Sequence, residues 1–372
     1  MHIRLPAPGP GSTVAVTAFA VPYAAGFLLF GPLVDRFGPR AVMIASVAGV
    51  LVGTLVTVVA PVWPLFLAGR VVQGLAAAPF TPAILLLTQR RVPPARRLVT
   101  TSAVISSGMA AAAVAQVVAQ LAEPVLGVRG VLVLSAAALA VSLVLVIVLI
   151  PAVPVSDSRG PTVSVVGSYR AMPRLLIHRR LTPLLLVALT YLTVFVGLYA
   201  VLQLTDRAGS AGELLVLRIS ALPAIAAIPL LSPMLVRIPG RRRMIVSIAA
   251  AAVSTALIGL LALTDHLSPL GFGVGMLLTA GAIAVAAPAT VTEVMATASD
   301  ATGAANALYL AAIFGGASLG TPIAAQVVSV AGTGDSGLGV FALVCTALLA
   351  LACIAAVLAS RTGNGRCGEI RS

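Results

Sequence analysis

Arg70 stands within an apolar segment, residues 62–88, that is long enough to cross a membrane as a helix. Gln73 follows three residues later, so the two side chains would lie on one helical face. An arginine at this depth costs about 2.5–17 kcal/mol, and such a residue usually faces an aqueous cavity or a polar partner. In the alternative interpretation, the long side chain reaches back to the membrane surface. The spacing predicts a polar site inside the membrane.

Uncharged polar and aromatic side chains form a second group of candidates. They recur at steps of three or four residues, which keeps them on one side of a helix. Few charges and several rings suit an amphipathic organic molecule, although aromatic side chains can also pack helix against helix or lie at the membrane interface. No acidic residue lies in the middle of an apolar segment. The group comprises Gln116 and Gln120, then Tyr191, Phe195, Tyr199 and Gln203, and finally Asn306 and Tyr309.

The sequence contains none of the common catalytic motifs of enzymes. We find no nucleophile elbow and no cluster of metal ligands, and a chain without lysine cannot form the phosphate loop Gly-x-x-x-x-Gly-Lys. The cysteines, at positions 345, 353 and 367, lack the spacing of a metal site. We therefore expect a protein that is not an enzyme and that holds neither a metal nor a cofactor.

Membrane helices must position these residues. The chain has 372 residues, of which 60% are hydrophobic and 9% are charged, whereas soluble domains carry roughly 25% charged residues. Its mean hydropathy is +1.12. Apolar segments of membrane-spanning length recur along the whole chain. They cover residues 13–34, 41–60, 62–88, 98–122, 130–153, 181–205, 214–236, 244–264, 267–292, 302–330 and 338–359. The sequence thus predicts an all-α membrane protein with eleven transmembrane helices.

Basic residues are concentrated in alternate connections between these segments. The net charge is +13, and all the basic residues other than histidine are arginines. Most of them fall in one set of connections and in the C-terminal tail, which the positive-inside rule assigns to the cytoplasm. The charge therefore indicates topology and argues against a nucleic-acid partner. We expect a multi-pass protein of the cell membrane with a cytoplasmic C-terminus.

A weak internal repeat divides the chain into halves. The stretch PLVDRFGPR, which begins at Pro32, aligns with PMLVRIPGR, which begins at Pro233. Two apolar segments precede the second copy but only one precedes the first, so we expect two pseudo-symmetric helical bundles of five plus six helices, with one helix missing before residue 13. The predicted parts are an N-terminal bundle at 13–153, a cytoplasmic linker at 154–180, a six-helix bundle at 181–360 and a cytoplasmic tail at 361–372.

Three motifs resemble those of the major facilitator superfamily. Residues 31–40, GPLVDRFGPR, are similar to its cytoplasmic signature between the second and third helices. Residues 70–74, RVVQG, resemble its fourth-helix motif, and residues 127–130, GVRG, resemble a Gly-Trp-Arg turn before the sixth helix, with Val128 where tryptophan is usual. The resemblance is greatest to the twelve-helix drug:proton antiporters of bacteria, although residues 106–120 lack the proline of their fifth-helix signature.

The resemblance implies roles for the candidate residues. Asp35 would pair with the N-terminus of the helix near Ser299, a contact that contributes roughly 0.3–2 kcal/mol and holds the cytoplasmic side closed. Alternatively, Arg36 and Arg40 only anchor the topology. Arg70 and Gln73 would serve proton coupling or line the cavity. The implied gating motif is Gly31, Asp35, Arg36, Gly38 and Arg40, and the implied substrate cavity is Gln116, Gln120, Tyr191, Phe195, Tyr199, Asn306 and Tyr309.

The sequence therefore predicts a monomeric secondary transporter in the lipid bilayer. Its expected activity is the export of a small hydrophobic or amphipathic compound in exchange for protons, by alternating access to a central site. A proton symporter that imports a small organic solute is the first alternative. The second is a truncated product that does not transport.

Overall fold

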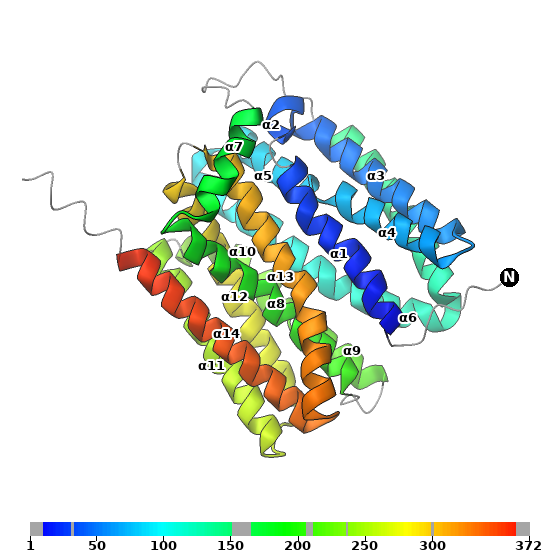
Figure 1. Cartoon of the computed structure of the whole chain (residues 1–372), viewed down its shortest axis with the longest axis vertical. Coiled ribbons are helices and arrows are strands. Elements are labelled where there is room, and N and C mark those ends of the chain that lie inside the picture. The colour runs from blue at the N-terminus through cyan, green and yellow to red at the C-terminus, as the bar shows by residue number, and fades with distance from the viewer. Residues whose placement is uncertain are drawn as a thin grey trace, which may run out of the picture. The chain divides into compact units, whose positions relative to one another are not determined.

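The fold is helical throughout the part of the chain that the structure describes. This structure is a computed structural model, and it describes residues 10–30, 33–150, 165–205, 211–235, 237–298 and 301–361, with no strand among them (Figure 1). The predicted all-α class is confirmed. The helices are α1 (Pro10–Phe30), α2 (Leu33–Phe37), α3 (Pro39–Val59), α4 (Trp63–Ala77), α5 (Phe80–Arg91), α6 (Pro94–Leu149), α7 (Val165–Leu176), α8 (Leu181–Leu204), α9 (Ala211–Ile219), α10 (Leu222–Leu235), α11 (Gly240–Leu263), α12 (Pro269–Thr297), α13 (Thr302–Ala331) and α14 (Asp335–Arg361).

The predicted apolar segments coincide with these helices. The segment at 62–88 is divided between α4 and α5 by a turn at residues 78 and 79. The segments at 98–122 and 130–153 run together as α6, whose backbone breaks at Gly127 with φ 64° and ψ 172°. Among the described residues, eight helical stretches are long and apolar enough to cross a membrane, and two shorter apolar ones are Val14–Phe30 and Leu215–Ile228.

Contacts between residues group the chain into two compact units. Unit 1 comprises Met1–Pro93, Val118–Arg174 and Asp300–Ser318, and unit 2 comprises Pro94–Val117, Leu175–Ser299 and Leu319–Ser372. The long helices α6 and α13 each contribute to both units, because their two ends pack with different neighbours. The units therefore differ from the predicted bundles at 13–153 and 181–360, and that division remains a prediction. Residues 151–164 of the predicted linker and 362–372 of the predicted tail lie outside the described residues.

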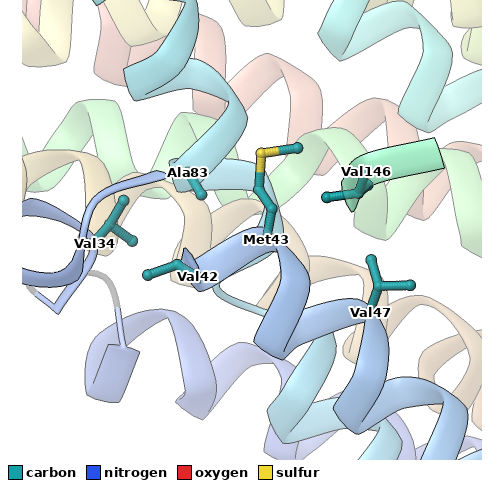
Figure 2. Close-up of a cluster of buried hydrophobic side chains, with 6 residues drawn as sticks. All are labelled: Val34, Val42, Met43, Val47, Ala83 and Val146. Carbon is teal, nitrogen blue, oxygen red and sulfur yellow. The ribbon is translucent and has the colours of Figure 1, made fainter. Parts of the chain in front are cut away.

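In unit 1, α4 packs against both α1 and α3. Small residues permit this close approach, as in other membrane helices. A Cβ atom at Gly69 would lie 2.4 Å from Oγ1 of Thr57 in α3, and one at Gly74 would lie 2.2 Å from the carbonyl oxygen of Phe19 in α1. On the other face of α3, Met43 reaches between Ala83 and Val146 in a buried apolar cluster (Figure 2). These contacts fix where the side chains of α1 and α4 meet.

In unit 2, α11 packs against α12 and α14, and α8 packs against the same two helices. Hydroxyl groups link the helices where their backbones approach. Ser254 donates to the carbonyl oxygen of Gly275 at 2.9 Å, and the hydroxyls of Thr255 and Thr346 lie 2.9 Å apart. The α8 helix is the most enclosed of the candidate spans, with 72% of its apolar window buried.

Candidate functional site

Arg70 and Gln73 form the centre of a polar network in unit 1. Nη1 of Arg70 donates to Oε1 of Gln73 at 2.7 Å, as expected for side chains three residues apart on α4. Nε2 of Gln73 in turn donates to Oγ1 of Thr54 in α3 at 2.9 Å. Gln73 is only 4% exposed. Because both ends of its amide are occupied, Gln73 holds the guanidinium of Arg70 in a fixed position.

The guanidinium of Arg70 also contacts α1. Its Nε donates to the carbonyl oxygen of Ala15 at 3.3 Å, and its Cζ lies 4.7 Å from the ring centroid of Phe19. A cation over an aromatic face is stabilised by the quadrupole of the ring. Among the described residues, no carboxylate pairs with Arg70. The site therefore carries a positive charge that a carbonyl, an amide and an aromatic ring stabilise, with no paired carboxylate among the described residues.

A row of aromatic rings extends from Phe19 along one face of α1. Phe19, Tyr23 and Phe27 follow at steps of four, with ring centroids 5.4 Å apart for the first pair and 4.9 Å apart for the second. Phe314 of α13 adds a fourth ring, which lies 4.8 Å from Tyr23 and 5.0 Å from Phe27. The Tyr23 hydroxyl has a hydrogen bond with the side chain of Thr81. We call Phe19, Tyr23, Phe27 and Phe314 the aromatic row.

The predicted aromatic residues of α8 lie in the interior of unit 2. Tyr191, Phe195 and Tyr199 are 0%, 2% and 4% exposed. The hydroxyl of Tyr191 lies 2.6 Å from that of Thr290 in α12, and the rings of Phe195 and Tyr199 meet edge to face at 5.1 Å. Gln203, one turn further, is exposed. In this conformation the three rings pack between helices, and their assignment to a substrate cavity remains a prediction.

The other predicted cavity residues are divided between the units. Gln116 belongs to unit 2, whereas Gln120, Asn306 and Tyr309 belong to unit 1. Tyr309 is 3% exposed and Asn306 is 9% exposed. Oδ1 of Asn306 is buried and has no hydrogen-bond partner within the described part of the chain. A buried acceptor without a partner costs about 1–3 kcal/mol, which makes Asn306 a candidate to bind a donor group of a substrate or a water molecule.

The structure describes only some residues of the predicted gating motif. Gly31 and Ser299 lie outside the described residues, as does the side chain of Asp35, so the predicted contact of that carboxylate remains a prediction. Arg36 is exposed. Nη2 of Arg40 donates to the carbonyl oxygen of Ile147 at 2.9 Å. This bond ties the start of α3 to the end of α6 within unit 1.

Gly38 shapes the turn between α2 and α3. It precedes α3 with φ 78° and ψ 153°, a backbone region that is essentially restricted to glycine. We expect Gly38→Ala to lower the free energy of unfolding by about 1–3 kcal/mol, measured as a lower thermal midpoint of the purified chain. Gly108→Ala is the control, because Gly108 is helical and a Cβ there meets no described atom within 4 Å. Equal midpoints for the two variants would contradict the prediction.

The aromatic row was not among the residues predicted from the sequence. The step of four that connects Phe19, Tyr23 and Phe27 is visible in the sequence, and the same criterion selected the rings of α8. Thr54 and Phe314 have no such signal, because they reach the site only through the packing of α3 and α13 within unit 1.

The described part of the chain is helical, and eight of its helical stretches are long and apolar enough to cross a membrane. Together with a half-buried arginine that has no carboxylate partner among the described residues, this defines a polytopic membrane protein with a polar site between its helices. The chain belongs to the Major Facilitator Superfamily, whose sequence profile matches residues 9–321. It is therefore a transporter by family, not an enzyme.

Two curated relatives match a short segment of the chain. Over 75 residues, the chain is 33% identical to the triacylglyceride transporter of Mycobacteroides abscessus and 35% identical to that of Mycolicibacterium hassiacum. The matched segment covers 20% of this chain, and 15% and 14% of the two relatives.

Solved structures share the fold at low sequence identity. The human organic anion transporter MFSD10 has a TM-score of 0.68 at 17% identity, over 93% of this chain and 83% of its own. The fucose:proton symporter FucP of E. coli has a TM-score of 0.67 at 15% identity, over 93% and 90%. The nucleoside transporter NupG has a TM-score of 0.66 at 13% identity, over 93% and 90%. These similarities confirm the major facilitator fold.

Proposed function

We propose that the protein is a secondary active transporter that exports a small hydrophobic or amphipathic compound across the cell membrane in exchange for protons, by alternating access. The observation that carries the proposal is the combination of Arg70 with the aromatic row. One charged group beside several rings suits a molecule with a polar head and an apolar body. The name of the two short-segment relatives, triacylglyceride transporter, supports an apolar cargo.

The charge of Arg70 also restricts the cargo. A cation placed within a few ångströms of the guanidinium would be repelled strongly, since two charges 4 Å apart interact by about 4 kcal/mol at an effective dielectric constant of 20. We infer that a neutral or anionic compound is preferred over a cationic one. Arg70 would bind the polar head, and Phe19 and Tyr23 would contact the apolar part.

The direction of transport can be tested in proteoliposomes that contain the full chain. The probes are anilinonaphthalene sulfonate, a permanent anion, and ethidium, a permanent cation, because a pH gradient does not move either of them as a weak acid or base. Exchange for protons predicts accumulation of the anion in vesicles with an acidic lumen. Vesicles without protein and vesicles treated with a proton-exchanging ionophore are the controls.

Import by proton symport is the second candidate, and one sequence feature favours it. Residues 106–120, within α6, contain Gly108 but no proline, unlike the fifth-helix signature of the exporters that the chain resembles. Symport predicts accumulation of the anion in vesicles with an alkaline lumen. Equal uptake of the anion under both gradients would contradict the proposed proton coupling. Uptake of ethidium alone would contradict the proposed preference for a neutral or anionic cargo.

A further inference from the structure

Unit 1 contains an apolar groove that has no part in the site described above. Its volume is about 380 Å³, which is within the range of roughly 300–1,000 Å³ for small-molecule sites. The groove is lined by residues of α1, α2, α3 and α4, and Ala41 and Ala45 at its opening are exposed. We call it the apolar groove, and its main lining residues are Phe30, Phe37, Ala41, Ala45, Leu75 and Ala76.

The chemistry of the lining excludes water as the main occupant. Ser46 is the one lining residue with a polar side chain, and its Oγ already donates to the carbonyl oxygen of Ala76 at 2.6 Å. A buried water needs two to four polar partners, and the other side chains of the groove offer none. The lining thus offers an occupant apolar contact and no free hydrogen-bonding side chain. A flexible hydrocarbon chain fits these limits.

A positive charge stands at the rim of the apolar groove. Arg36 is exposed, and its Cζ lies 5.6 Å from the ring centroid of Phe37, which lines the groove and is itself 55% exposed. Arg36 belongs to the short α2, between the end of one membrane helix and the start of the next. A guanidinium at such a boundary complements the phosphate of a lipid headgroup.

We propose that the apolar groove binds one acyl chain of an anionic phospholipid from the surrounding bilayer, with the phosphate of the same lipid at Arg36. The chain covers Ala41 and Ala45, and the headgroup stays at the membrane surface. The site is a lipid site of the transporter, separate from the cargo site at Arg70.

Fluorescence quenching by lipids with brominated acyl chains tests this site. The chain has one tryptophan, Trp63, which stacks on Phe66. Trp63→Phe removes that signal and Phe37→Trp places a reporter in the groove. The reconstituted protein is titrated with brominated phosphatidylglycerol and brominated phosphatidylcholine. We expect about a five-fold higher relative affinity for phosphatidylglycerol, since one basic residue near an anionic lipid contributes roughly 1 kcal/mol.

Two further variants separate the headgroup from the chain. Arg36→Gln should abolish the preference for phosphatidylglycerol while quenching by phosphatidylcholine persists, and Arg174→Gln, at another exposed arginine, should leave the preference unchanged. Ala45→Leu fills the groove and should reduce quenching by both lipids at least two-fold. Ala140→Leu, at an exposed position of α6, is its control.

The proposal is overturned by equal relative affinities for the two lipids, or by quenching that Ala45→Leu does not change. Quenching that falls as the ratio of protein to lipid rises would show that a second copy covers the groove, which also overturns it. If Ala45→Leu fails to give monodisperse protein, Ala41→Leu replaces it, because Ala41 lies at the same opening.

Discussion

Replacing Arg70 by alanine is expected to lower the initial rate of transport in proteoliposomes at least ten-fold. The variant removes the cation of the site, together with the hydrogen bond to Gln73 at 2.7 Å and the contact with the Phe19 ring at 4.7 Å. A hydrogen bond to a charged group contributes about 1.5–3 kcal/mol, and 1.4 kcal/mol corresponds to a factor of ten. The loss should therefore exceed one order of magnitude if the guanidinium contacts the cargo.

Variants of neighbouring residues show whether the charge or its position matters. Arg70→Lys keeps the positive charge. An ammonium group, however, lacks the planar set of donors with which the guanidinium bonds both Gln73 and Ala15, so we expect an intermediate transport rate. Arg129→Ala is the matched control, because Arg129 is an exposed arginine of the same unit with one long contact, Nη2 to the carbonyl oxygen of Ala60 at 3.4 Å. If Arg70→Ala is folded and transports like Arg129→Ala, Arg70 has no part in transport.

Replacing Gly74 by leucine is expected to prevent the accumulation of folded protein. A Cβ at this position would lie 2.2 Å from the carbonyl oxygen of Phe19. This oxygen belongs to the backbone, so no rotamer change removes the clash, and α1 and α4 must separate. Overpacking costs about 1–3 kcal/mol when side chains can adjust, and here the whole helix pair must move. Gly74→Ala should lower the thermal midpoint, and Gly74→Leu should abolish the monodisperse peak in size-exclusion chromatography.

Gly108→Leu is the control for this clash. Gly108 is also helical and exposed, but a Cβ there meets no described atom within 4 Å, so this variant should accumulate like the original chain. A monodisperse Gly74→Leu protein with an unchanged thermal midpoint would show that α1 and α4 do not approach each other in this way.

The helical class and the polar pair on α4 could be predicted from the sequence. Apolar segments of membrane length are a strong signal, because every backbone group must be satisfied within the bilayer and a helix does so by itself. The spacing of Arg70 and Gln73 predicted two side chains one turn apart, and their hydrogen bond confirms it. Both predictions rest on local geometry, which neighbouring residues determine.

The partners from other helices could not be predicted in this way. Thr54 reaches Gln73 only because α3 packs on α4, and Phe314 joins the rings of α1 only because of how the first part of α13 packs within unit 1. Sequence periodicity shows which side of a helix carries a group but not what that side contacts. The same limit applies to α8. The spacing of Tyr191, Phe195 and Tyr199 places them on one side of the helix, and that side could equally line a cavity or pack in the protein interior.

The surroundings of α6 differ from those of the other spans. Only 6% of its apolar window, within Val99–Leu149, is buried inside the protein, compared with 72% for α8. This apolar stretch of α6 therefore has little contact with neighbouring helices of the described chain, and we expect acyl chains of the bilayer to cover it. Solubilisation replaces those chains, so we expect short-chain detergents to loosen this stretch of α6 before the other spans, and nanodiscs to preserve its packing.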